Sequence, residues 1–267
     1  MIDLHTHHER CGHAHGPLDA YAASAVTRGV TILGFSDHAP LFASRDDHSA
    51  PGIQMAISDF EGYLAECDAV RARFANELDV RIGVEADFIA GTEATYRERL
   101  ARAELDYVIG SVHAFDGHHI YDPSTWPAGV DAADLHLRYH QAIQAAVGSK
   151  MFDVLGHLDA LKVFAPAPVN RDVDRALAAT LDAVAKSGIV VEINTSGLRK
   201  CGELFPAPSL VAQLHRRGVR FTFGSDAHHP DEVAYGWGQV VELLRSLGVD
   251  DLVTFVAREA RPVRVAA

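Results

Sequence analysis

The stretch Ile2-Asp3-Leu4-His5-Thr6-His7 joins a short apolar, strand-like run to two histidines at its end. Six later stretches follow the same plan, in which a run rich in Val, Ile, Leu or Phe ends in residues able to bind metal or phosphate. They span residues 32–38, 82–85, 108–113, 154–157, 190–196 and 221–228. Short, nearly continuous apolar runs are typical of strands buried on both faces, so we expect seven strands of a parallel sheet.

Segments with helical periodicity separate these runs. They span residues 17–28, 58–78, 93–103, 131–147, 173–186, 209–217 and 232–247. Ser58, three residues before Glu61, predicts a capping box at the second of them. Alternating strands and helices predict an α/β fold with right-handed crossovers. Seven units favour a closed or nearly closed barrel over the alternative of an open, doubly wound sheet, because a barrel brings all strand ends to one rim, where such folds hold active sites.

Length and composition restrict the class of protein. A chain of 267 residues suits one domain, which we expect to span residues 1–267. The formal charge of −12 and the scattered Lys and Arg residues argue against a nucleic-acid-binding surface and favour a small-molecule substrate. The three cysteines form no CxxC pair, and neither a signal peptide nor a membrane-spanning run is evident, so we expect a cytoplasmic protein that is not bound to a membrane.

Histidine is the outlier of the composition, with 16 residues, and many lie at the ends of predicted strands. His5 and His7 alternate, so both side chains point to one side of the first strand. Every other run but one ends in a candidate ligand: His38, Glu85, His113, His157, and the pair Asp226 and His228. Imidazoles and carboxylates without thiolates suit zinc, manganese or iron in a multinuclear hydrolytic site.

Two long loops leave the ligand-bearing ends of the strands, at residues 39–57 and 114–130. We expect them to wall or cover the site. Whether they close over it is not evident from the sequence.

The order of the motifs resembles the four-motif pattern of the polymerase and histidinol phosphatase (PHP) family. The segments that carry this resemblance are residues 3–7, 11–14, 34–38, 110–113, 156–159 and 224–228. Cys11-Gly12-His13-Ala14, Glu192-Ile193-Asn194-Thr195-Ser196-Gly197-Leu198-Arg199-Lys200 and Leu204-Phe205-Pro206 are more similar to the histidinol-phosphate phosphatase branch than to other branches.

The resemblance implies a distorted seven-stranded, TIM-like barrel that holds three divalent metal ions at the C-terminal rim of its strands. One ion would be bound by His5, His7, Glu85 and Asp226, and Glu85 would bridge to a second ion bound by His113 and His157. The third would be bound by His13, His38 and His228. The implied activity is hydrolysis of L-histidinol phosphate to L-histidinol and phosphate in histidine biosynthesis, by attack of a metal-bound hydroxide on phosphorus.

Candidate residues for the substrate are fewer. Arg199 follows the sixth strand, and its planar donors could reach a phosphate at the rim; Lys162 is a second candidate. No proton donor to the leaving group stands out: Asp37, His229 and metal-bound water are all open, and the two side chains could equally support ligands. His8 and His15 are expected to be solvated loop residues.

Three other functions compete with this interpretation. They are a PHP phosphoesterase acting on nucleotides or nucleic acid, an amidohydrolase-like metal hydrolase, and a non-catalytic metal-storage or metal-sensing protein. The low positive charge argues against the nucleic-acid version, and a phosphate-directed Arg199 argues against storage. The native metal and the oligomeric state are left open.

Overall fold

The computed structural model describes residues 1–265 and contains one seven-stranded sheet of parallel strands in chain order. The strands are β1 (Ile2–Asp3), β2 (Ile32–Phe35), β3 (Asp79–Asp87), β4 (Tyr107–Ser111), β7 (Val154–Leu155), β8 (Val190–Asn194) and β9 (Phe221–Gly224). Each lies within one of the seven apolar runs or overlaps it, which confirms the predicted strands. Their buried side chains explain why the runs lack a polar face.

The first and last strands of the sheet meet, so the sheet curls into a nearly closed barrel. The Leu4 N–H donates to the Phe223 carbonyl oxygen at 2.9 Å. Beyond the ends of the two strands, Thr6 and Ala227 form a parallel β-bridge. The α/β barrel prediction is thereby confirmed, and the open-sheet alternative is excluded. All seven strands deliver their C-terminal ends to the same rim.

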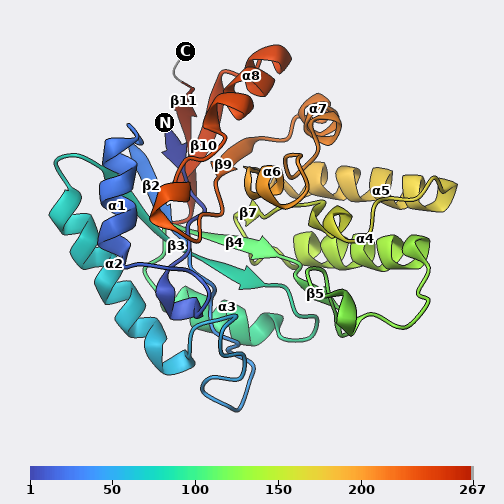
Figure 1. Cartoon of the computed structure of the whole chain (residues 1–267), viewed down its shortest axis with the longest axis horizontal. Coiled ribbons are helices and arrows are strands. Elements are labelled where there is room, and N and C mark those ends of the chain that lie inside the picture. The colour runs from blue at the N-terminus through green and yellow to red at the C-terminus, as the bar shows by residue number, and fades with distance from the viewer. Residues whose placement is uncertain (266–267) are drawn as a thin grey trace.

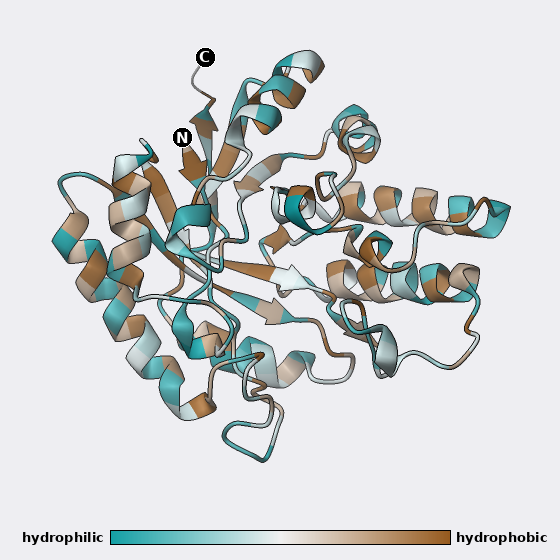
Figure 2. Ribbon diagram, viewed as in Figure 1, coloured by the Kyte–Doolittle hydropathy of each residue, from teal (hydrophilic) through white to brown (hydrophobic). Residues whose placement is uncertain are grey.

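Helices surround this barrel. They are α1 (Leu18–Thr27), α2 (Phe60–Phe74), α3 (Glu93–Ala101), α4 (Ala132–Ser149), α5 (Arg171–Ser187), α6 (Ser196–Lys200), α7 (Pro208–Arg216) and α8 (Trp237–Leu247). Figure 1 shows α1 and α2 on one side of the strands and the long pair α4 and α5 on the other. In Figure 2 the helices carry both brown and teal turns, as expected for helices that pack one face on a core.

Two details of the helix prediction are wrong. Ser58 does not cap α2: it lies in the short 3-10 turn η2 (Ile57–Asp59), and its hydroxyl donates to Asp47 at 2.7 Å. The last helix begins at Trp237 and not at residue 232, because the backbone at Ala234 and Gly236 has positive φ values of 56° and 72°. A positive φ cannot continue a right-handed helix.

Two short two-stranded ribbons and several 3-10 turns lie outside the barrel sheet. A ribbon of β5 (Ala114–Phe115) and β6 (His118–His119) stiffens the second long loop, and a hairpin of β10 (Asp251–Val256) and β11 (Glu259–Arg264) follows α8. Neither pair was predicted. The remaining 3-10 turns are η1 (Glu9–Cys11), η3 (Pro123–Thr125), η4 (Ala160–Val163) and η5 (Pro230–Glu232). Across residues 1–265, every helix is too short or too polar to cross a bilayer.

Candidate metal centre and pocket

The predicted ligands gather at the C-terminal rim of the barrel, although they come from six strands. The eight that follow or end strands are His5, His7, His38, Glu85, His113, His157, Asp226 and His228, and His13 joins them from the loop after η1. Seven of the eight have buried side chains, and His228 is about one quarter exposed. Buried ionisable groups need a partner or a metal.

Glu85 lies at the centre of the cluster, and its two carboxylate oxygens face different histidines. Oε1 lies 3.0 Å from Nε2 of His157 and 3.5 Å from Nε2 of His113. Oε2 is close to a second set of nitrogens: it lies 3.4 Å from His5 Nε2, 3.6 Å from His7 Nε2 and 3.1 Å from His38 Nδ1. A carboxylate that divides its oxygens in this way can bridge two metal ions.

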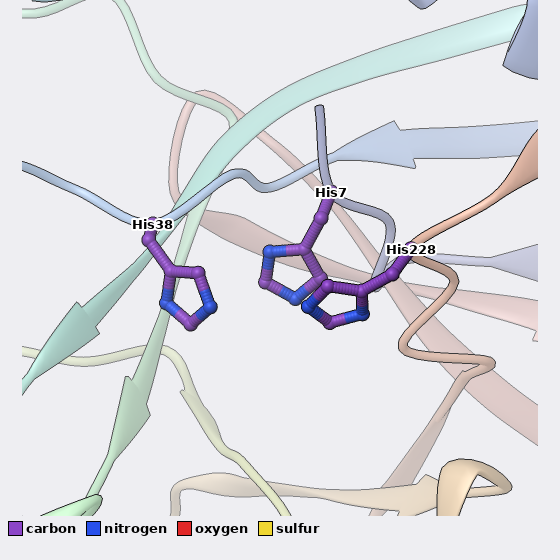
Figure 3. Close-up of side chains that lie close together, drawn as sticks. All are labelled: His7, His38 and His228. Atoms are coloured by element: carbon purple, nitrogen blue, oxygen red, sulfur yellow. The ribbon is translucent and has the colours of Figure 1, made fainter. Parts of the chain in front are cut away.

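A third group of imidazoles lies beside the first two. Figure 3 shows His7, His38 and His228 pointing into one space. One ring nitrogen of each lies within 4.8 Å of the others. His13 approaches from the solvent side, with its Nε2 atom 3.0 Å from Nε2 of His228. The geometry thus places His7 between two groups, whereas the sequence prediction assigned it to the first ion alone.

The distances within the cluster fit a metal site. In a tetrahedral zinc site with metal–nitrogen bonds of about 2.0–2.1 Å, two ligand atoms lie about 3.3 Å apart. The separations around Glu85 range from 3.0 to 3.6 Å. His5 Nε2, both ring nitrogens of His7, and Glu85 Oε2 are also buried without a hydrogen-bond partner. Because such atoms are rare in folded proteins, the cluster is well suited to bind divalent metal.

Asp226 is held in an unusual conformation that separates the tasks of its two oxygens. Its φ of 53° is left-handed, a strained backbone conformation that is enriched at functional sites. Oδ2 accepts hydrogen bonds from Ser196 Oγ at 2.8 Å and Lys200 Nζ at 3.2 Å. Oδ1 instead faces His7 Nε2 at 3.1 Å. One oxygen is thus fixed by donors while the other is directed into the cluster.

Electrostatics divide the cluster into groups whose protonation state already suits a metal and groups that must first lose a proton. Burial alone would raise the pKa of Glu85, but the charges of His113, His5 and His38 hold it well below its usual range. Burial and the charge of His7 place the pKa of His228 well below the ordinary value of 6.5. The same two causes lower the pKa of His38. Although burial lowers it, nearby carboxylates raise the pKa of His5 and His7 above the ordinary value and that of His113 to about 9. Because an ionised carboxylate and neutral imidazoles are the forms that coordinate metal ions, these three histidines would lose a proton when metal binds.

A pocket of about 480 Å³ opens over the cluster. Both long loops contribute to its wall, as predicted: Gly52 and Ile53 come from the first, and His119 and Tyr121 from the second. The remaining lining residues are His13, His38, Glu85, His113, Arg199, Lys200, Asp226, His228 and Glu232. A volume of this size accommodates a small organic ligand.

Two cations line this pocket, but only one of them was predicted. Arg199 lies at the rim, where its guanidinium pairs with Glu232 at 3.2 Å and covers the ring of Tyr235. Lys200 reaches Asp226 and lies 4.8 Å from the centre of the Tyr121 ring. The sequence reasoning missed Lys200 because α6, the short helix that aims it, has no clear signal of its own.

Lys162 is placed elsewhere. Its ammonium group bonds to Asp159 at 2.9 Å, Glu203 at 2.8 Å and the Leu204 carbonyl oxygen at 2.7 Å. These three acceptors occupy its three donors, and Lys162 lines a different cavity, on the side of α4 and α5. The structure therefore gives no support to Lys162 as a phosphate ligand.

The two residues considered for proton transfer occupy contrasting positions. Asp37 is fully buried, accepts from the His38 N–H at 2.9 Å and lies 3.4 Å from Nδ1 of His7, so it supports ligands. His229 is half exposed, caps η5 through the Asp231 N–H and does not line the pocket. His15 is exposed as predicted, whereas the expectation of a solvated His8 is wrong, because that side chain is buried beside Glu66.

Comparisons with known proteins agree with this geometry. The model of the PHP domain family matches residues 3–196. The chain belongs to the PHP domain family. The predicted resemblance is confirmed; Arg199, Asp226 and His228 lie beyond the matched range, and the relatives described next extend over them.

The relatives share nearly the full length of the chain. A protein of Deinococcus radiodurans named "Probable histidinol-phosphatase" is 39% identical over 266 residues, which cover 98% of this chain and 99% of that protein. The histidinol-phosphatase of Bacillus subtilis is 27% identical, with 90% and 98% covered. A histidinol phosphate phosphatase of Lactococcus lactis, solved with zinc, L-histidinol and phosphate, superposes with a TM-score of 0.84 at 20% identity and covers 97% of this chain and 98% of that one. The last likeness supports the barrel fold.

Proposed function

We propose that this protein hydrolyses L-histidinol phosphate to L-histidinol and inorganic phosphate. The observation that carries the proposal is the position of Glu85, whose two oxygens divide between two sets of histidines directly below a pocket that Arg199 and Lys200 line. The full-length relatives named as histidinol-phosphatases support this substrate over other phosphomonoesters. We further propose that residues 1–267 act as a single PHP barrel domain; the described residues 1–265 share a connected hydrophobic core.

We propose that three divalent ions, zinc, manganese or iron, occupy the cluster. His5, His7, Glu85 and Asp226 would hold the first, and Glu85 would share the second with His113 and His157. His13, His38 and His228 would hold the third. When bound, such ions neutralise charge on phosphoryl oxygens and lower the pKa of a water molecule that can act as the nucleophile.

The chain's own residues would bind and orient the ester. Arg199 offers a planar pair of N–H donors that suits two phosphoryl oxygens, and Lys200 adds a point charge from the same wall. Asp226 Oδ2 and the Tyr121 ring hold the Lys200 ammonium in place. Ile53 and His119 are the wall residues that the organic part of the substrate would contact, and they come from the two loops.

The test is a phosphatase panel with the metal-loaded protein. Zinc or manganese is added, and kcat/KM is compared for histidinol phosphate, nucleotides and sugar phosphates. We expect histidinol phosphate to be preferred by more than about tenfold, which corresponds to about 1.4 kcal/mol in transition-state binding. A preference for nucleotides would replace the proposed substrate and retain the hydrolytic class, whereas no phosphatase activity with any metal would contradict the proposal.

A further inference from the structure

Glu192 is a buried carboxylate inside the barrel that stands outside the proposed set of metal ligands. It lies within β8, the one strand that contributes no candidate ligand, and is 1% exposed. Its neighbours along the strand, Val191 and Ile193, are the residue types normally found at such positions. An ionised carboxylate in this place is costly unless several groups compensate its charge.

Three donors from three segments compensate it. Oε1 of Glu192 lies 2.6 Å from Nδ1 of His5. Oε2 accepts from the backbone N–H of His157 and from Nδ2 of Asn194, both at 3.0 Å. The carboxylate therefore contacts two proposed ligands, His5 and His157, which follow strands β1 and β7.

The surrounding backbone leaves room for this carboxylate. A Cβ atom at Gly224 of β9 would lie 1.9 Å from Oε1 of Glu192 and 2.6 Å from Cβ of His5. Any side chain at position 224 would therefore displace Glu192 or His5. The glycine that ends β9 thus makes the contact between Glu192 and His5 possible.

The contact also decides which nitrogen of His5 is available. A neutral imidazole donates from one nitrogen and accepts at the other, and a carboxylate at Nδ1 keeps the proton on Nδ1. Nε2 is then left with its lone pair, and it is buried without a hydrogen-bond partner, 3.4 Å from Glu85 Oε2. Carboxylates that hold metal-binding histidines in this way strengthen metal binding.

We propose that Glu192 is a positioning residue for the metal centre: it fixes the tautomer and ring orientation of His5 and holds the backbone of His157. This inference rests on the proposed roles of His5 and His157 as ligands. It differs from the pairing of Asp87 with His113 at 2.6 Å, because Asp87 of β3 contacts one ligand, which follows the adjacent strand β4, whereas Glu192 contacts two ligands that follow different strands.

The variant Glu192→Gln tests the proposal with little change in shape. A glutamine has one acceptor oxygen, so it cannot satisfy donors on both sides of the carboxylate, and at least one of the three contacts is lost. We expect zinc affinity, measured by competition with a chromophoric chelator, to fall by about 10–100-fold. We also expect the visible spectrum of the cobalt-substituted protein to change, because the His5 ring turns.

Asp153→Asn is the matched control, since Asp153 is another largely buried carboxylate but lies before β7 and pairs with Arg258, away from every candidate ligand. Its zinc affinity should stay within about twofold of the original protein. Zinc affinity of Glu192→Gln equal to that of the original protein would overturn the proposal. If the original protein binds neither zinc nor cobalt, the proposed metal-dependent function is contradicted, and the role of Glu192 falls with it.

A measurement on the unaltered protein covers the case in which Glu192→Gln does not fold. Nitrogen-15 labelling of the histidines in the zinc-loaded chain should show His5 protonated at Nδ1, with assignment from a His5→Gln sample. His5 protonated at Nε2 would contradict the role of Glu192.

Discussion

Buried carboxylates at the two ends of the barrel differ in how their oxygens are satisfied. At the C-terminal rim, His5 Nε2, both ring nitrogens of His7, and Glu85 Oε2 are buried without hydrogen-bond partners. At the N-terminal end, Asp106 lies before β4 and accepts from the N–H groups of Ile82 and Ala257 and from Arg71. One oxygen of Glu85 at the rim therefore lacks a hydrogen-bond partner, whereas both oxygens of Asp106 at the opposite end accept hydrogen bonds.

The C-terminal hairpin of β10 and β11 supplies several of the hydrogen bonds at the N-terminal end of the barrel. Arg258, in the turn between β10 and β11, donates to Asp153 and to the Met151 carbonyl oxygen, and its own N–H bonds to the Asp106 carbonyl oxygen. Phe255 of β10 is buried and stacks on Tyr107 with ring centres 6.1 Å apart. The comparison teaches that substitutions at the rim should change activity, whereas substitutions at the opposite end should change stability.

The largest effect is expected for Glu85→Gln. Loss of the charge at the centre of the cluster should lower kcat/KM for histidinol phosphate by more than about 100-fold, because support of a ligand alone is worth 10–100-fold. The zinc-dependent rise in Tm, measured by differential scanning fluorimetry with and without zinc, should also disappear. Retention of activity within tenfold would break the distinction between the two ends.

At the other end, Arg258→Ala should lower the free energy of unfolding by about 2 kcal/mol. Loss of a fully buried partner costs about 3–5 kcal/mol, and the value is reduced here because the Arg258 side chain is one third exposed. Urea unfolding of the metal-free protein measures it. At temperatures where the variant is folded, kcat/KM should match that of the original protein, and a tenfold loss would show that the two ends are coupled.

A smaller effect on catalysis should distinguish Arg199 from Lys162, the two cations that the sequence offered as phosphate ligands. Arg199→Ala should raise KM or lower kcat/KM for phosphoesters by about tenfold, because a hydrogen-bonded charge is removed from the pocket. Lys162→Ala is the matched control and should leave both values unchanged, since its ammonium bonds to Asp159, Glu203 and Leu204. An equal rise of KM in both variants would contradict the placement of phosphate beside Arg199.

The smallest effect concerns a histidine outside the cluster. Burial, together with the charge of His136, lowers the pKa of His140 in α4 to about 4. The unfolded chain binds this proton at about pH 6.5, so stability from neutral His140 is present above pH 6.5 and is lost as the pH falls toward 4. Between pH 7 and 5.5 the loss should be about 1 kcal/mol in urea unfolding of the metal-free protein. His140→Phe should reduce it, and an unchanged pH dependence would show that other groups cause it.

Much of the fold could be predicted because its signals are local. Each of the seven strands is a short apolar run, and the polar residue that follows the run must lie at the C-terminal rim once the strands are parallel. The hairpin of β10 and β11 was missed for the opposite reason: no helix separates its strands, and Pro262 in β11 suggests an irregular tail. Its place is decided by the barrel end that it covers.

The candidate site was predictable as a set of residues but not as a set of contacts. His5, Glu85 and Asp226 were identified by position alone, whereas Lys200 and Glu192 acquire their roles from groups on other strands. Lys162 shows the reverse case, because Asp159 and Glu203 hold its ammonium away from the pocket. A side chain's partners depend on segments distant in the chain, and no local pattern records them.

The sequence by itself determined the order of the strands, the helices between them and the identity of the residues at the rim, because hydrophobic periodicity and chain direction are properties of neighbouring residues. Only the tertiary structure decided which atom of each residue faces the cluster. His5 presents Nε2 because Glu192 holds Nδ1, and Asp226 presents Oδ1 because Ser196 and Lys200 hold Oδ2. These choices arise when the barrel closes and brings β8 beside the ends of β1 and β9.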